Sequence, residues 1–529
     1  MSSNSGNITG HSVFFCTFLL ETVLASPPQA SSSSVKAAPG SKQAQANQPK
    51  QNSPTKERLR ARVRQLQMKL LRLKKKVASQ SKRKVEGKES VSEAIAVLSR
   101  HFSGPALDLI LSQIRLSQRT KKGYRWNHQT KSLALTLLHA SPKAYQILSK
   151  VFVLPSIQTL RKSVRSVQVY PGLSGKFLET FQKKVESLSD QSKVCALIFD
   201  EMAIKESVSY NAEKDQVEGF EDFGSFGRTK YVANHATVFM ARGLSEKWKQ
   251  PVGYYLSSGP MSSLMLKDLI LLCINKLIAL GLIVKLLICD QGSNNLSALQ
   301  THLRVTLESP FFFVNNLKVF FLYDPPHLLK SIRNNFKKYG FSVNDKQVLW
   351  KFIEQVYNVN SNFPISMVPR LTKKHIDLPP FSSLRVRYAA QVLSHSVGVG
   401  ISTLVSLKVM DEDAMSTSFF VERFDQLFNV FNSSAPSSTQ KYRFALSENS
   451  VHFAFLDECL AWFNDVKSLG PRQPACLKGW KMAIVCLKML WADLCSNHSF
   501  RFLYTNCLNR LSGKLVLCDS WQRCAAGQS

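Results

Sequence analysis

Hydrophobic positions divide the chain into segments with different periods. From residue 56 to 80, apolar residues recur at alternating intervals of four and three, at Leu59, Val63, Leu66, Leu70, Leu73 and Val77. This heptad spacing predicts an α-helix that pairs with a second helix along an apolar seam. The intervening residues are mostly Lys and Arg, so we expect a basic coiled coil over residues 56–85. We expect a disordered leader over residues 1–55, which are dominated by Ser, Pro, Ala and Gln from residue 26 onward.

Short helical patterns occupy residues 90–170. Three short helices with tight joints are predicted over Leu133–His139, Pro142–Val151 and Pro155–Val164. This arrangement suits a helix-turn-helix segment that binds DNA. The basic residues Arg161, Lys162 and Arg165 of the last helix could face a duplex, or they could simply form a basic surface.

Strand patterns begin near residue 193. Apolar runs predict strands at Val194–Phe199, Ala236–Met240, Val252–Leu256, Ile283–Cys289 and Lys318–Leu322. Helices are predicted from about Ser262 to Leu280, from Gly292 to about Leu307, and from Asp324 onward. Three antiparallel strands, a helix and a parallel strand are the order of ribonuclease-H-like folds, so we expect an α/β protein with a mixed sheet. Residues 219–227 lack a phosphate-loop motif, and we expect an ordinary loop there.

Composition and charge narrow the function. The 529 residues contain 69 Lys and Arg against 36 Asp and Glu, a net charge of +33, which indicates a polyanionic partner such as DNA. The 11 cysteines include no CxxC pair, which argues against a zinc ribbon or a disulfide scaffold and favours a reducing compartment. No apolar run reaches the roughly 18 residues that a membrane-spanning helix needs, so we expect no membrane association.

Two acidic residues stand at the ends of apolar strands. Asp200 follows Ile198-Phe199, and Asp290 follows Ile288-Cys289. Carboxylates at neighbouring strand ends can hold Mg²⁺ ions about 4 Å apart for phosphodiester chemistry, so both residues are candidate metal ligands and catalytic residues. The alternative is that each aspartate only caps a following turn or helix.

These residues also carry a resemblance to a known family. The segments Ile198–Lys205, Cys289–Asn295 and Asp324–Lys330 resemble the P-element transposase family, which includes the transposase-derived THAP proteins. The resemblance implies a nuclear protein that cuts and joins DNA with a ribonuclease-H-like domain of three acidic residues, interrupted by a mainly α-helical insertion that binds GTP. Asp200 and Asp290 match the first two carboxylates. The implied division is residues 190–330 for the first part of the catalytic domain, 331–469 for the insertion and 470–529 for a truncated second part.

The resemblance also implies nucleotide-binding residues in the insertion. They are Arg370, Arg385, Val386, Ser394, Phe428, Asn429 and Asn432. The family has an aspartate that pairs with the guanine edge where this chain has Asn429. An amide offers one acceptor and one donor group instead of two acceptors, so the resemblance leaves the nucleotide specificity open.

Two departures from the family pattern bear on activity. Residues 1–55 contain one cysteine, Cys16, and one histidine, His11, so we expect no zinc-coordinating THAP finger there. Residues 511–529 contain a single acid, Asp519, in surroundings unlike the family's third acidic motif. We therefore expect impaired cleavage. The alternatives are a non-catalytic, DNA-binding or dimerising regulator of transposition, and a protein-interaction factor without a nucleic-acid role.

Overall fold

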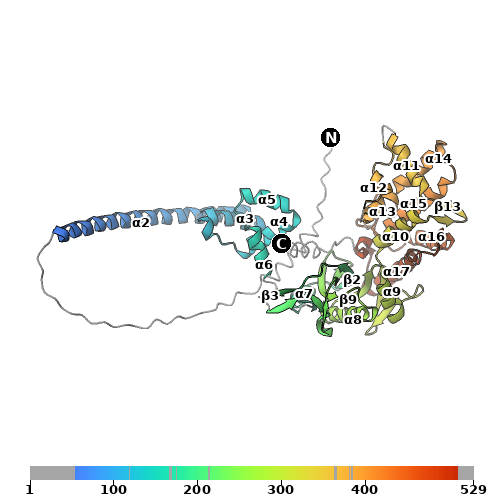
Figure 1. The fold of residues 1–529 in the computed structure, drawn as a ribbon, viewed down its shortest axis with the longest axis horizontal. Helices are drawn as coiled ribbons and strands as arrows, with labels where there is room; N and C mark the ends of the chain where they lie inside the picture. The colour runs from blue at the N-terminus through green and yellow to red at the C-terminus, as the bar shows by residue number, and fades with distance from the viewer. Residues whose placement is uncertain are drawn as a thin grey trace. The chain divides into compact units, whose positions relative to one another are not determined.

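The computed structural model describes residues 54–509, except 118, 166–169, 174, 212–214, 363–365, 380–381 and 383–384. The predicted leader and the residues that follow Asn509 lie almost entirely outside this part. The chain divides into two compact units, one up to Gln168 and one from Val169 onward (Figure 1).

The first unit opens with one long helix. Helix α2 spans Pro54–His101, which confirms a helix over the heptad segment and extends it by a further 16 residues beyond 85. Along residues 61–75 every side chain is exposed, including Val63, Leu66, Leu70 and Leu73 of the seam. Pairing of this seam with a second helix stays a prediction.

Four further helices complete this unit: α3 (Gly104–Ser117), α4 (His128–Ala140), α5 (Pro142–Val151) and α6 (Ile157–Arg165). The last three confirm the predicted trio. Asn127 and Ser141 accept hydrogen bonds from the first turns of α4 and α5, which explains where both helices begin. A small core of Ala134, Leu135, Tyr145 and Leu160 joins them.

The second unit is built on a nine-stranded sheet. Its central strands are β2 (Val194–Ala203), β7 (His235–Gly243), β8 (Lys249–Ser257), β9 (Ile283–Cys289) and β11 (Leu317–Tyr323). They lie in the order β11-β9-β2-β7-β8, with β2, β9 and β11 parallel and β7 and β8 antiparallel. This confirms the predicted ribonuclease-H-like mixed sheet.

The connection between β2 and β7 contains more structure than the sequence analysis expected. It forms β3 (Ser209–Asn211), β4 (Gln216–Glu218), β5 (Phe220–Asp222), the 3-10 turn η2 (Gly224–Phe226) and β6 (Arg228–Val232). The expectation of an ordinary loop over 219–227 was wrong, because β5 pairs with β6 and with β8. Strands β1 (Gly172–Leu173) and β10 (Phe311–Val314) complete the sheet.

Five described helices of this unit come before or after the insertion in sequence. These are α7 (Gly175–Glu186), α8 (Ser263–Ala279), α9 (Ser293–Ser297), α10 (Pro325–Lys338) and α17 (Ala475–His498). Among them, α7, α8 and α17 contact strands of the sheet. Helix α9 continues only through a π-helical turn to His302, not to 307, and Arg304 then adopts a left-handed conformation that cannot extend a helix. Helix α17 contacts β11, and its Asp493 forms an ion pair of 2.9 Å with Lys285 of β9.

Between α10 and α17 lies a mainly helical segment. Its helices are α11 (Lys351–Asn362), α12 (Lys373–Ile376), α13 (Val386–Val392), α14 (His395–Ser406), α15 (Ala414–Val430) and α16 (His452–Asp465). A small sheet joins β12 (Phe341–Val343), β13 (Lys346–Val348) and β15 (Val466–Ser468), and β14 (Leu446–Ser447) pairs with β16 (Phe502–Leu503) ahead of the 3-10 turn η5 (Thr505–Leu508). The core of this helical segment is aromatic, with Phe420 and Phe424 of α15 packed against Trp462 of α16.

Candidate functional site

The carboxyl ends of the three parallel strands bring acidic residues to one edge of the sheet. Ile198 of β2 pairs with Ile288 of β9, so Asp200 and Asp290 both lie two residues beyond a paired position. Asp200 lies within its strand and not after it, because β2 continues to Ala203 beside β7. Asp324 directly follows Tyr323, which pairs with Cys289, and its backbone N–H donates to the Cys289 carbonyl. Ligand sites of open α/β sheets lie outside these carboxyl ends.

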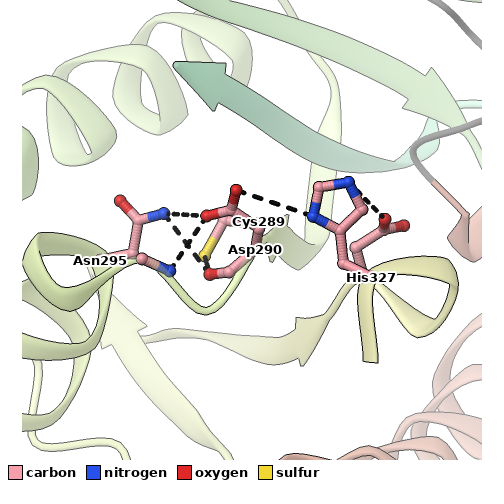
Figure 2. A network of polar contacts seen from close by, with 6 residues as sticks. Cys289, Asp290, Asn295 and His327 are labelled. Carbon is pink, nitrogen blue, oxygen red and sulfur yellow. Dashed lines mark hydrogen bonds and ion pairs between the residues drawn. The ribbon is translucent and has the colours of Figure 1, made fainter. Parts of the chain in front are cut away.

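Asp290 is held by the start of α9 (Figure 2). Its Oδ1 accepts hydrogen bonds from the backbone N–H of Gly292 (3.1 Å) and from Nδ2 of Asn295 (2.7 Å). Asn295 is buried, with 8% of its surface exposed. Asp290 therefore does cap the following turn, as the alternative interpretation held, but through one carboxylate oxygen only.

The second carboxylate oxygen of Asp290 faces a histidine. His327 of α10 lies with Nδ1 3.7 Å from Asp290 Oδ2 and with Nε2 3.9 Å from Oδ2 of the fully buried Asp324 (Figure 2). The imidazole thus stands between two carboxylates from neighbouring strand ends. In the sequence, His327 could equally have been a polar helix start; only the sheet register shows that α10 begins beside Asp290.

A further carboxylate lies nearby on β2. Glu201 accepts a hydrogen bond of 3.3 Å from the backbone N–H of Met261, whose carbonyl accepts one from Asn294 of α9. Burial raises the pKa of Glu201; this hydrogen bond and His235 oppose the rise, and the negative charge of Asp290 adds to it. The loop at Met261 therefore connects the end of β2 to the start of α9.

These residues suit a divalent cation by their donor chemistry. Mg²⁺ prefers carboxylate oxygens, and Asp200 and Asp290 supply them from adjacent strands. Within residues 54–509, outside the gaps stated above, no group of three or more His, Cys, Asp or Glu side chains converges as a metal site. The pair thus fits the ion, whereas a three-ligand set is not formed by this part of the chain.

The candidate nucleotide residues fall into two groups. In the first, Arg385 precedes α13 and lies over the ring of Tyr388, 5.9 Å from its centre. Val386 begins that helix, and Ser394, which precedes α14, donates to the carbonyl of Gln391. Arg370 is exposed, three residues before α12.

The second group lies on α15 and just after its end. Asn429 is buried, and its Nδ2 donates a hydrogen bond of 3.0 Å to Oδ2 of Asp425, one helical turn earlier. Burial raises the pKa of Asp425, while the backbone N–H of His395, at the start of α14, donates to it and opposes the rise. Phe428 is half-buried, and Asn432 accepts a hydrogen bond from Asn509. The sequence motifs alone did not indicate a role for Asp425.

Three family models match successive parts of the chain. They describe a helix-turn-helix domain like that of the transposable element P transposase (residues 85–162), a TNP-like RNase H N-terminal domain (169–302) and a TNP-like GTP-binding insertion domain (326–444). The chain belongs to the P-element transposase family.

Two relatives match part of the chain. The chain is 27% identical to the transposable element P transposase of Drosophila melanogaster over 332 residues, covering 62% of this chain and 41% of that protein. It is 25% identical to the human DNA transposase THAP9 over 333 residues, covering 59% of this chain and 36% of that protein. The chain thus matches about two fifths of the length of these relatives.

A solved structure has the same fold. The Drosophila P element transposase strand transfer complex matches with a TM-score of 0.64 at 23% identity, covering 82% of this chain and 92% of that chain. Together with the family models, this likeness agrees with a ribonuclease-H-like P-element fold. Among the described residues, no helix is long and apolar enough to cross a membrane.

Proposed function

We propose that this chain is a P-element-type transposase or transposase-derived protein that binds DNA in the nucleus and has metal-dependent phosphodiester chemistry as its ancestral reaction. The proposal rests on the sheet register. Asp200 and Asp290 each lie two residues beyond a pair, Ile198 and Ile288, on adjacent parallel strands. The net charge of +33 supports DNA as the partner. Residues 331–469 form the insertion in this proposal, and the catalytic domain resumes at residue 470.

The chain's own residues prepare the site for such an ion. Asp200 and Asp290 would hold Mg²⁺, which would neutralise negative charge that develops on a phosphodiester. Gly292 and Asn295 fix one oxygen of Asp290, so its other oxygen stays directed toward His327. His327, backed by the buried Asp324, limits the rotation of this second oxygen.

Cleavage of a DNA end tests this proposal. Because we expect impaired cleavage, the Mg²⁺- or Mn²⁺-dependent nicking that remains should be weak, and it should be lost in Asp200→Ala and in Asp290→Ala. Asp190→Ala is the matched control, because Asp190 precedes β2 and is 95% exposed. Nicking that survives in both active-site variants would contradict the assignment. If the unaltered chain binds DNA without nicking it, the proposed regulator role below accounts for the protein better.

We also propose that the insertion binds GTP through Arg370, Arg385, Val386, Ser394, Phe428, Asn429 and Asn432. The Asp425–Asn429 pair supports a guanine preference despite the amide. A carboxylate can only accept, so the hydrogen bond to Asp425 fixes Nδ2 of Asn429 toward it and leaves Oδ1 as an acceptor. That oxygen and the Asp425 carboxylate together offer two acceptors for the two adjacent N–H groups of guanine, whereas adenine presents a donor beside an acceptor.

A second candidate function is a dimerising regulator. The seam residues Val63, Leu66, Leu70 and Leu73 are 51–60% exposed, and a long helix rarely leaves such a stripe without a partner. We infer that two copies pair along this seam. The basic flanks repel each other, so dimerisation should strengthen as salt or DNA screens them. Light scattering of a Leu66→Lys/Leu70→Lys variant tests this, and an unchanged mass relative to the parent chain would refute it.

A further inference from the structure

The insertion has a concentration of exposed cations apart from the acidic edge of the sheet. Residues 370–391 contain five basic residues, Arg370, Lys373, Lys374, Arg385 and Arg387, and all five side chains are exposed. Asp377 is the only acid in this stretch. None of the five forms an ion pair with a carboxylate in the described part of the chain. We call these five residues the α12–α13 basic face.

A buried histidine holds this face together. His375 of α12 is 2% exposed; its Nε2 lies 3.0 Å from Oε1 of Gln391 in α13, and its ring packs edge-on against Tyr388 at 4.9 Å. Its Nδ1 lies 3.0 Å from the backbone nitrogen of Thr372. Arg385 stacks on the same Tyr388. Cations separated by about a dozen positions in sequence are thereby fixed on adjoining helices.

Helix α10 connects this face to the candidate active site. It begins at Asp324 and His327 beside Asp290, and near its other end Lys337 donates to the carbonyl of Ile376 at the end of α12. Figure 1 shows α10 at the junction between the strands and the helices of the insertion. With 14 residues, α10 is about 21 Å long, which equals about six base pairs of DNA.

We propose that the α12–α13 basic face is a second DNA-binding surface, which contacts phosphates of the same duplex about six base pairs from the phosphodiester at Asp200 and Asp290. This inference rests on the proposed DNA-binding function. DNA fits better than a nucleotide alone, because Lys373, Lys374 and Arg387 remain exposed beside the two arginines that the proposed function assigns to GTP. Contacts of this kind position a duplex without reading its sequence.

The test compares two charge reversals in the full chain. Lys373→Glu/Lys374→Glu alters the basic face, and Lys346→Glu/Lys467→Glu changes the net charge equally at exposed positions on β13 and β15. DNA affinity is measured from 50 to 300 mM salt with a duplex that contains a cleavable end. We expect the first variant to bind more weakly and to lower the slope of log K against log salt by about two, relative to the control. GTP affinity should equal that of the parent chain.

The possible outcomes distinguish failure of the second DNA surface from failure of the proposed DNA-binding function. Equal slopes in the two variants would overturn the second DNA surface. Loss of GTP binding with an unchanged DNA slope would assign the lysines to the nucleotide phosphates instead and would equally overturn it. Failure of the parent chain to bind DNA would refute the proposed function itself. A photo-crosslinker at position 374 adds an independent readout, with crosslinks expected about six base pairs from the cleaved bond and contradicted by crosslinks at random positions.

Discussion

Asn295 donates a hydrogen bond of 2.7 Å to the carboxylate of Asp290, and both residues lie at the junction of β9 with α9. The amide is buried, so its loss leaves a charged acceptor without its strongest described donor. We expect Asn295→Ala to lower the free energy of unfolding by about 2 kcal/mol, as for hydrogen bonds to charged groups. Metal-dependent nicking should fall as well, because Asp290 would gain rotational freedom.

Ser293→Ala is the matched control for this prediction. Ser293 begins the same helix but is exposed, so its variant should unfold like the parent chain. Asn295→Asp should be worse than Asn295→Ala at neutral pH, since it places a second carboxylate against Asp290. Chemical denaturation and Mn²⁺ titration measure both effects. A fully stable and active Asn295→Ala variant would show that Gly292 alone orients Asp290.

Lys249 of β8 gives the chain a specific pH dependence. Burial, with the nearby charge of Arg242, lowers the pKa of Lys249 from 10.5 to about 7. An amine with a depressed folded-state pKa binds fewer protons in the folded chain, so the free energy of unfolding rises with pH between about 7 and 10.5. The contribution approaches about 1.4 kcal/mol per pH unit inside this window and vanishes outside it.

Replacing this lysine should remove that slope. Lys249→Met should be more stable than the parent chain at pH 7, and the difference should shrink as the pH approaches 10. Lys247→Met is the control, because Lys247 is exposed two residues earlier. Denaturation at several pH values checks the prediction, and parallel stability curves for the parent and Lys249→Met would refute it.

Much of the sheet follows directly from the sequence because buried parallel strands are continuous apolar runs. Ile283–Cys289 is apolar at every position except Lys285, and the observed strand has the same bounds. The hairpins between β2 and β7 could not be found this way. Strand β5 contains Phe220, Glu221 and Asp222. Its position depends on pairing with β6, which follows after a turn, and with β8, which is distant in sequence.

Some residues of the candidate sites could likewise be recognised in the sequence, and others could not. Asp200 and Asp290 were recognisable, since an acid directly after an apolar run is conspicuous. His327 and Asp425 were not, because their partners are set by packing: α10 must begin beside β9, and α14 must start next to α15, before either contact exists. Residues 510–529, where a third catalytic acid was expected to be missing, lie outside the described residues, so that expectation stays a prediction.

The Asp425–Asn429 pair predicts the nucleotide preference of the insertion. We expect the parent chain to bind GTP more tightly than ATP, and Asp425→Asn to lose at least tenfold of that preference, because an amide can no longer fix the orientation of Asn429. Asn429→Asp should keep the preference. Inosine triphosphate, which lacks the second N–H group, should bind the parent chain more weakly than GTP. Calorimetry gives these affinities, and equal binding of GTP and ATP by the parent chain would exclude this pair as the base-reading element.

The buried ion pair of Lys285 and Asp493 predicts how firmly α17 is held on the sheet. Their side chains are 10% and 13% exposed, and Asp493 also accepts a hydrogen bond from Asn497. Removing one partner leaves a buried charge, so Lys285→Met should cost about 3 kcal/mol of unfolding free energy. A Lys285→Met/Asp493→Leu double variant should recover most of that loss, since two apolar side chains replace two desolvated charges. Because Asp290 directly follows β9, the single variant should also weaken nicking, and the double variant should restore it. If the double variant is as unstable as the sum of the two single variants, packing of α17 does not depend on this pair.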